Sequence, residues 1–243
     1  MSSTKIILED VRKSFGGRTV VNVDSLTLGE HPIEGLIGPN GAGKTTSFYM
    51  VVGLVRSNSG RILLNGQDIS HLPMHSRAKL GIGYLPQEPS IFRKLTVQEN
   101  LMAVLETDKS LSPQQRSRRV EQLLEESNIG HKRDTLGISL SGGERRRAEI
   151  ARAIALRPYF ILLDEPFAGI DPISVGDIQQ IIDYLRNTGI GIIITDHNVR
   201  ETLDICDHSY ILTEGKVLTQ GTAKQILSHQ GVRDVYLGSK FKI

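Results

Sequence analysis

Three short segments of the chain carry residues suited to phosphate chemistry, and the first is a P-loop. Gly38–Thr45 reads Gly-Pro-Asn-Gly-Ala-Gly-Lys-Thr, in which the glycines let backbone N–H groups turn toward phosphates. Lys44 supplies a positive charge, and the Thr45 hydroxyl can bind Mg²⁺. The segment follows an apolar run and precedes a helical pattern, so it predicts a nucleoside triphosphate site. The residues expected to contact the nucleotide are Gly38, Pro39, Asn40, Gly41, Ala42, Gly43, Lys44, Thr45 and Thr46.

The second segment is an apolar run that ends in two carboxylates. Phe160–Leu163 precedes Asp164 and Glu165. Two adjacent acids are usually only solvated, but after an apolar strand in a chain with a P-loop they indicate a metal site and a base. We expect Asp164 to hold Mg²⁺, directly or through water, and Glu165 to polarise the water that attacks the terminal phosphate.

The third segment is Ser141-Gly142-Gly143-Glu144, in which Ser141 and Glu144 have the spacing of a helix capping box. A helix that begins with two glycines offers bare N–H groups and a positive dipole end, both suited to an anion. We therefore expect Ser141, Gly142 and Gly143 to contact a nucleotide phosphate.

Together these segments resemble the ATP-binding cassette (ABC) ATPases, and the resemblance assigns further residues. His197, in Thr195-Asp196-His197, corresponds to the switch histidine that hydrogen-bonds the γ-phosphate. Gln87 corresponds to the Q-loop glutamine that senses Mg²⁺ and the attacking water. Phe15 stands where the family places an aromatic ring against adenine, although a phenylalanine before a Gly-Gly turn could also be a core residue.

The resemblance also implies a second copy of the chain. In the family the Ser-Gly-Gly segment of one protomer meets the phosphate bound by the other, so that two ATP molecules lie inside a head-to-tail homodimer. Phe167–Asp171 resembles the D-loop that crosses this interface. The run Arg145–Arg147 is interpreted as mostly solvated charge, because three consecutive positions fan around a helix.

Several longer stretches resemble the cytoplasmic ATPases of lipopolysaccharide-export transporters. That family places the homodimer beneath two inner-membrane permease subunits on the cytoplasmic face, where the chain would not touch the transported lipid. Phe92 and Arg93 are the candidate permease contacts; the alternative is a core phenylalanine and a solvated arginine. The stretches are Phe48–Leu54, Tyr84–Phe92, Phe167–Val175, Thr195–Leu203 and Tyr236–Gly238 with Phe241.

Three residues depart from the family pattern. Glu144 replaces a commoner glutamine but can still cap its helix, and Pro32 stands where a Gly-Glu turn is usual. Glu34 falls inside a strand expected to be apolar, where a buried carboxylate needs a partner.

Other functions compete with that of a lipopolysaccharide transporter. The ATPase of a branched-chain amino-acid importer would share the architecture. A soluble DNA-repair or chromosome ATPase would need a long heptad insertion, and a translation-associated factor would need two cassettes; the sequence has neither. A catalytically silent ATP-binding module is disfavoured by the presence of Lys44, Glu165 and His197.

Composition is that of a globular cytosolic protein. The 243 residues are 39% hydrophobic and 23% charged, and a net charge of +2 gives no footprint for nucleic acid. There is no signal-peptide pattern and no apolar run long enough to span a bilayer, so any membrane role must come through a partner. Cys206 is expected to pack in the core on a stripe with Val199 and Leu203.

The pattern of expected strands and helices, together with the ABC resemblance, predicts an α/β fold. This fold would be a P-loop NTPase core with an antiparallel β-subdomain and an ABC-type helical subdomain. We expect a single domain over 1–243, with residues 95–157 as the helical block. Helices should start at Ser112, Ser141 and Asp171-Pro172, the last ending near Gly189, and tight turns should form at Asn65-Gly66 and Glu214-Gly215. The expected strands are Ile6–Val11, Ile33–Ile37, Arg61–Leu64, Ile82–Leu85, Phe160–Leu163, Ile190–Thr195, Ser209–Leu212 and Val217–Thr219.

Overall fold

The computed structural model describes residues 4–168, 172–197 and 199–233, and its described strands form two sheets. The antiparallel sheet has the order β2-β1-β4-β5, and the larger sheet has the order β10-β9-β3-β8-β7-β6, parallel except for the β9–β10 hairpin. The strands are β1 Ile6–Phe15, β2 Arg18–Leu28, β3 Ile33–Ile37, β4 Ser59–Leu64, β5 Gln67–Asp68, β6 Ile82–Leu85, β7 Phe160–Asp164, β8 Gly191–Asp196, β9 His208–Thr213 and β10 Lys216–Gly221.

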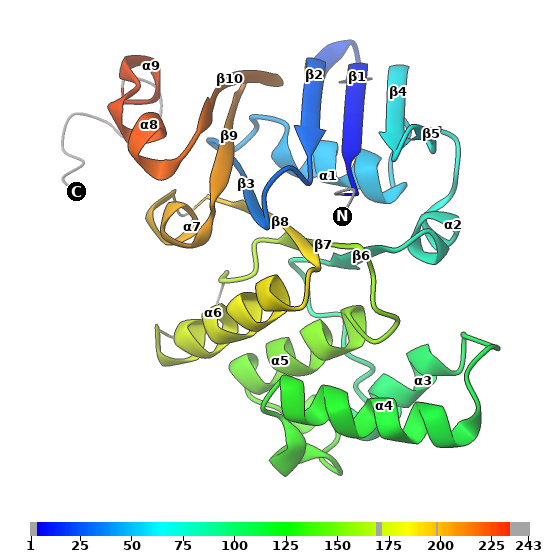
Figure 1. Cartoon of the computed structure of the whole chain (residues 1–243). Coiled ribbons are helices and arrows are strands. Elements are labelled where there is room, and N and C mark those ends of the chain that lie inside the picture. Colours follow the sequence, from blue (N-terminus) through cyan, green and yellow to red (C-terminus); the bar gives the residue numbers. More distant parts are fainter. Residues whose placement is uncertain (1–3, 169–171, 198, 234–243) are drawn as a thin grey trace.

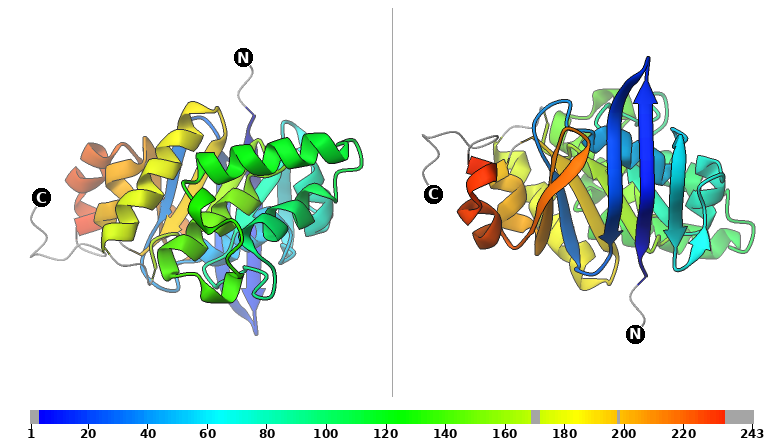
Figure 2. Two further views of the ribbon diagram at one scale, coloured as in Figure 1. Left: turned by 90° about the horizontal axis from the view of Figure 1, so that it is seen from below. Right: turned by 90° about the horizontal axis from the view of Figure 1, so that it is seen from above.

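The helices lie in layers around the larger sheet (Figure 1). One helix, α1, lies between the two sheets, whereas α3 to α6 cover the opposite face; Figure 2 shows this helical layer from below. The helices are α1 Lys44–Val52, α2 Met74–Lys79, α3 Val97–Leu105, α4 Pro113–Glu126, α5 Gly142–Ala153, α6 Pro172–Asn187, α7 Val199–Ile205, α8 Ala223–Ser228 and α9 Gln230–Val232.

Strand β7 shows how the sheet separates two cores. Its side chains alternate: Ile161 and Leu163 pack into the cluster formed by α3 to α6, whereas Phe160 and Leu162 pack into the cluster around α1 and the antiparallel sheet. All four are almost fully buried. A strand covered on both faces must be apolar along its whole length, which explains the continuous run in the sequence.

The predicted fold class and most of the predicted elements are confirmed. Every expected strand is present, some with the expected bounds and others extended or shifted by a few residues. Strand β2 and the two-residue strand β5 were not among the expected strands. Asn65-Gly66 and Glu214-Gly215 have positive φ at both positions, as tight hairpin turns require. Ser112 and Ser141 both form complete capping boxes. Helix α6 begins at Pro172 as expected, while Asp171 lies outside the described residues.

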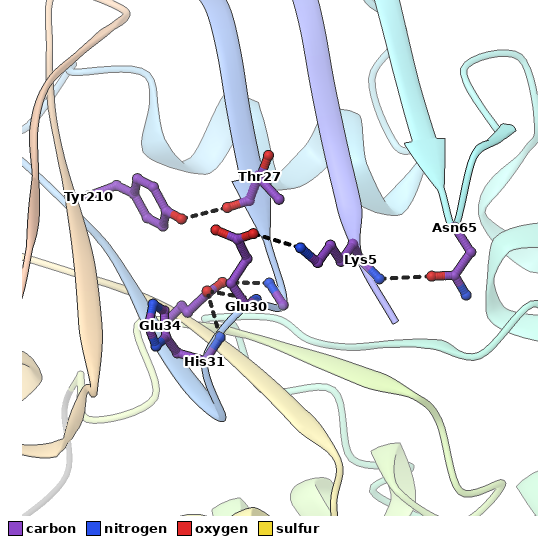
Figure 3. A network of polar contacts seen from close by, with 8 residues as sticks. Lys5, Thr27, Glu30, His31, Glu34, Asn65 and Tyr210 are labelled. Carbon is purple, nitrogen blue, oxygen red and sulfur yellow. Dashed lines mark hydrogen bonds and ion pairs between the residues drawn. The ribbon is translucent and has the colours of Figure 1, made fainter. Parts of the chain in front are cut away.

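Glu34 is fully buried in β3, and its partners are backbone donors instead of a cation (Figure 3). Its Oε2 accepts a hydrogen bond from Gly29 N at 2.7 Å, and its Oε1 accepts from Glu30 N and His31 N, each at 3.1 Å. Burial raises the pKa of Glu34, and these N–H groups oppose the shift. The carboxylate therefore closes the turn that joins β2 to β3, and β3 itself is regular despite Pro32.

Two expectations about single side chains are corrected. Arg146 and Arg147 are only 5% and 8% exposed, so the interpretation of this run as mostly solvated charge is wrong. Their guanidinium groups find carbonyl and carboxylate acceptors on other segments, which the helical spacing alone does not reveal. Cys206 follows the end of α7, is partly buried and packs against the core of α3 to α6, whereas Val199 and Leu203 belong to a different cluster. Burial raises the pKa of its thiol to about 12, which favours the neutral thiol at neutral pH.

Candidate functional site

The phosphate loop connects the end of β3 to the start of α1. Gly43 immediately precedes the helix with φ of 97°, and a Cβ there would lie 2.6 Å from the Val20 carbonyl oxygen. At Gly38 a Cβ would lie 2.3 Å from the Leu212 carbonyl oxygen. A Cβ at Gly41, by contrast, would meet no atom within 4 Å. Glycines 38 and 43 are therefore required by close backbone contacts, while the rim of the loop at Gly41 is open to a ligand.

Lys44 begins α1 and is folded inward. Its side chain is 5% exposed, and Nζ donates hydrogen bonds to the carbonyl oxygens of Gly38 at 2.7 Å and Pro39 at 3.0 Å. Burial lowers the pKa of Lys44, while Glu165, Asp196 and Asp164 raise it. The negative charges of these three carboxylates, at the ends of β7 and β8, therefore favour the charged form of Lys44.

Asp164 ends β7 and is 1% exposed. Its Oδ1 accepts a hydrogen bond from Thr195 Oγ1 at 2.6 Å, and its Oδ2 accepts one from Tyr84 Oη at 3.3 Å. Burial raises the pKa of Asp164, and these two hydroxyl donors lower it. A carboxylate has more acceptor sites than these two bonds use, so it retains capacity for a further ligand.

Glu165 contacts two of the residues that the ABC resemblance assigned, Gln87 and His197. Its Oε2 accepts a hydrogen bond from Gln87 Nε2 at 2.7 Å and lies 3.3 Å from His197 Nδ1. Glu165 has φ of 44°, unusual for a residue with a side chain, and its backbone N–H is bonded to Thr195 O at 2.8 Å. The backbone of Glu165 is therefore held in an unfavourable conformation at the residue whose carboxylate contacts Gln87 and His197.

Three residues of α5 bind the segment that follows β6, and the sequence did not reveal them. Arg146 donates to Pro86 O at 2.7 Å and to Asp164 O at 3.3 Å. Glu149 accepts from Ser90 N at 2.6 Å and from Ile91 N at 3.0 Å. Arg152 donates to Ser90 Oγ at 2.7 Å. Helix α5 therefore binds the chain on both sides of Gln87 and also the end of β7.

The Ser141-Gly142-Gly143 segment lies at the N-terminus of α5, in the helical layer on the other side of the sheet from α1 (Figure 1). Ser141 Oγ accepts from Glu144 N at 3.3 Å, and Ser141 N donates to Glu144 Oε2 at 2.9 Å. The Ser141 N–H lowers the pKa of Glu144, and Lys132, 3.1 Å away, lowers it further. A Cβ at Gly142 would meet no atom within 4 Å, so space beside the segment is open.

Three other predicted contact residues lie on the surface. Phe15, at the end of β1, is 50% exposed, which rules out a core role, and Lys13 Nζ lies 4.9 Å from its ring centroid. Phe92 is also exposed, and one face of its ring packs on the Arg152 guanidinium. Arg93 is exposed beside it. Of the predicted D-loop, Phe167 is buried and Gly169–Asp171 lie outside the described residues.

The oxygen donors at the site fit Mg²⁺ bound together with a nucleotide. Asp164, the Thr45 hydroxyl and the Gln87 amide are hard oxygen ligands, and Mg²⁺ in such sites takes one or two carboxylates while substrate phosphates and water supply the rest. Among the described residues no cluster of three or more His, Cys, Asp or Glu side chains could hold a metal by itself.

A P-loop at the end of a parallel strand, two acids at the end of a neighbouring strand and a separate helical layer define a P-loop nucleoside triphosphatase of the cassette type. The model of the ABC transporter family matches residues 21–168, and the chain belongs to this family.

Curated relatives extend the similarity over nearly the full chain. The Lipopolysaccharide export system ATP-binding protein LptB of Haemophilus influenzae is 62% identical over 97% of this chain and 98% of its own length. The protein of the same name from Escherichia coli K12 is 57% identical with the same coverage.

Solved structures agree with the fold. A nucleotide-free ATP-binding cassette from an ABC transporter has a TM-score of 0.85 at 28% identity, covering 97% of this chain and 100% of its own. An ATP-binding cassette in its ADP conformation has a TM-score of 0.84 at 28% identity, covering 98% of this chain and 100% of its own. No helix in the described ranges is long and apolar enough to cross a membrane.

Proposed function

We propose that the chain is the ATP-hydrolysing subunit of a transporter that exports lipopolysaccharide, and that it works as a homodimer beneath two permease subunits. The observation that carries the ATPase is the placement of Glu165 between Gln87 and His197, beside the buried Lys44. The lipopolysaccharide assignment is supported by the relatives named above, which match 97% of this chain.

Each residue of the site has a separate role in transferring the γ-phosphoryl group to water. Backbone N–H groups of Asn40–Thr46 hold the β- and γ-phosphates. The ammonium group of Lys44, which now donates to the carbonyl oxygens of Gly38 and Pro39, donates to phosphate oxygens instead when ATP is bound. Glu165 accepts the proton of the attacking water. Gln87 orients that water, and His197 donates a hydrogen bond to the γ-phosphate. Phe15 stacks on adenine from the end of β1.

Mg²⁺ would be held by Thr45, Gln87 and Asp164, and when bound it neutralises charge on the phosphates. Asp164 is ready for this role because its carboxylate is held in place by hydrogen bonds on both oxygens.

The Ser141-Gly142-Gly143 segment acts on the ATP of the partner copy. It lies in a different layer from the phosphate loop of its own chain (Figure 1), and its glycine N–H groups at the N-terminus of α5 suit an anion. An isolated protomer then binds ATP but hydrolyses it poorly.

The permease contacts are assigned to Phe92 and Arg93, which are exposed just after Gln87. The backbone of Phe92 is held by Asn100, whose side chain bonds both Phe92 N and Phe92 O. The protein would lie on the cytoplasmic face of the inner membrane, bind no nucleic acid and make no direct contact with the transported lipid.

The ATPase is tested with Glu165→Gln. The variant should bind Mg-ATP, form a stable dimer and lose nearly all turnover, because the amide cannot accept the proton. Turnover equal to that of the unchanged protein would refute the assignment of Glu165 as the base. Absence of Mg-dependent hydrolysis in the unchanged protein would point to a silent ATP-binding module.

The transport role is tested separately by recovering the tagged chain from membranes. Permeases that carry lipopolysaccharide should co-purify with it, and Phe92→Ala should weaken their recovery without changing ATP binding. Recovery of amino-acid importer permeases instead would support the branched-chain alternative.

A further inference from the structure

The carboxylate of Asp164 accepts one hydrogen bond from each of the two strands beside β7. The sheet order β8-β7-β6 puts β7 in the middle, and Asp164 is the last residue of β7. Thr195 on β8 is the register partner of Asp164, while Tyr84 on β6 is the partner of Leu162. Because side chains alternate along strands, all three of these polar side chains emerge on the face that carries Leu162.

That face is the one covered by α1 and the phosphate loop. Leu162 belongs to the core cluster around α1, which fixes the side of the sheet. The Tyr84 ring packs edge-on against Tyr49 of α1, with centroids 6.4 Å apart and planes at 90°. Tyr84 therefore contacts α1 through its ring and the carboxylate of Asp164 through its hydroxyl.

We propose that Tyr84 and Thr195 are positioning residues for the metal ligand Asp164, each fixing one of its carboxylate oxygens. Thr195 Oγ1 donates to Oδ1 at 2.6 Å and Tyr84 Oη donates to Oδ2 at 3.3 Å. With both oxygens bonded, the carboxylate cannot rotate freely about its Cβ–Cγ bond. Its remaining lone pairs are then presented in one direction for Mg²⁺ bound with ATP.

The two donors are not equivalent. Thr195 is fully buried and its bond is short, so the loss of that hydroxyl leaves a buried oxygen without a donor. The Tyr84 bond is long for O–H···O, and the ring is only partly buried. Loss of a group that orients a metal ligand typically weakens metal affinity about 10- to 100-fold. We expect Tyr84→Phe near the lower end of that range and Thr195→Val near the upper end.

The inference rests on the proposed function, and the test separates the two. Mn²⁺ is titrated into the full-length protein with a non-hydrolysable ATP analogue, and bound Mn²⁺ is followed by electron paramagnetic resonance. Nucleotide affinity is measured in parallel in EDTA. Tyr159→Phe, which removes an exposed tyrosine hydroxyl elsewhere, is the matched control.

Tyr84→Phe should raise the dissociation constant for Mn²⁺ about tenfold while leaving metal-free nucleotide binding and the Tyr159→Phe control unchanged. Thr195→Val should raise it further, and Thr195→Ser, which keeps the hydroxyl, should restore it. An unchanged Mn²⁺ affinity in Tyr84→Phe, including one accompanied by a lower melting temperature, would overturn the inference. Failure of the unchanged protein to bind Mn²⁺ with nucleotide would instead count against the proposed function.

Discussion

Arg146 offers the sharpest test of how α5 is tied to the catalytic strands, because it is buried and makes three separate contacts. Its guanidinium bonds Pro86 O at 2.7 Å and Asp164 O at 3.3 Å, and lies 3.5 Å from Glu149 Oε2. Arg146→Met removes all three and leaves the buried Glu149 without this cation. Breaking a buried ion pair from one side costs about 3–5 kcal/mol.

The expected loss is large enough to measure by thermal unfolding. In a chain of this size 1 kcal/mol shifts Tm by about 2–4 °C, so Arg146→Met should lower Tm by about 6–20 °C. Turnover should fall as well, because Pro86 adjoins Gln87. Arg145→Met is the matched control, since the side chain of that partly exposed neighbour makes no hydrogen bond or ion pair within the described part of the chain. The stability of this variant should differ from that of the unchanged protein by less than about 0.5 kcal/mol.

The double variant Arg146→Met with Glu149→Gln checks the reasoning further. The amide oxygen introduced at position 149 can still accept from Ser90 N and Ile91 N, while the unpaired negative charge is gone. The two changes should therefore be coupled by about 1–3 kcal/mol, with the double variant more stable than their separate effects predict. A single Arg146→Met variant that melts within about 2 °C of the unchanged protein would refute the role of Arg146 as a buried anchor.

Three other predictions concern the β2–β3 turn, the α5 cap and adenine binding. Glu34→Gln should lower the free energy of unfolding by about 1–3 kcal/mol in denaturant titration, because one amide oxygen cannot accept from the N–H groups of Gly29, Glu30 and His31 together. The control is Glu30→Gln, which removes an exposed ion pair and should lower the free energy of unfolding by less than about 1 kcal/mol. Glu144→Gln should cost about 0.5–1 kcal/mol at pH 7. Because the folded pKa of Glu144 is lowered, that difference should be present above about pH 4.5 and vanish as the pH falls through the folded pKa, and a pH-independent difference would contradict it. Phe15→Ala should weaken ATP binding by about 1–3 kcal/mol in calorimetry without lowering Tm, since the ring is half exposed; unchanged affinity would remove Phe15 from the adenine site.

The sequence could predict that the site residues lie near one another, because these residues follow the ends of strands. Gly38, Asp164 and His197 each come at or directly after the end of a parallel strand, and such ends meet at one edge of a sheet. The capping boxes at Ser112 and Ser141 are local patterns, which is why they could be predicted and are present. The roles assigned to these residues stay predictions until the variants are measured.

What the sequence did not reveal depends on contacts between distant segments. Strand β2 could not be predicted because Asp24 and Ser25 interrupt its apolar alternation, while its pairing with β1 supplies the ladder. Helical spacing predicts a solvated charge at Arg146, because it says nothing of the distant segments that supply the acceptors Pro86 O and Asp164 O. The sequence shows that Glu34 needs a partner, but nothing local indicates that three backbone N–H groups supply it.

The central claim is that each ATP is hydrolysed between two copies of the chain, by the phosphate loop of one and the Ser141–Gly143 segment of the other. The most direct test mixes two inactive variants, Lys44→Ala and Ser141→Arg, and measures ATP hydrolysis. If the claim holds, mixed dimers contain one intact site, and the mixture hydrolyses ATP well above the sum of the separate variants. If hydrolysis in the mixture equals that sum although mixed dimers form, the two segments act within one chain and the claim is wrong.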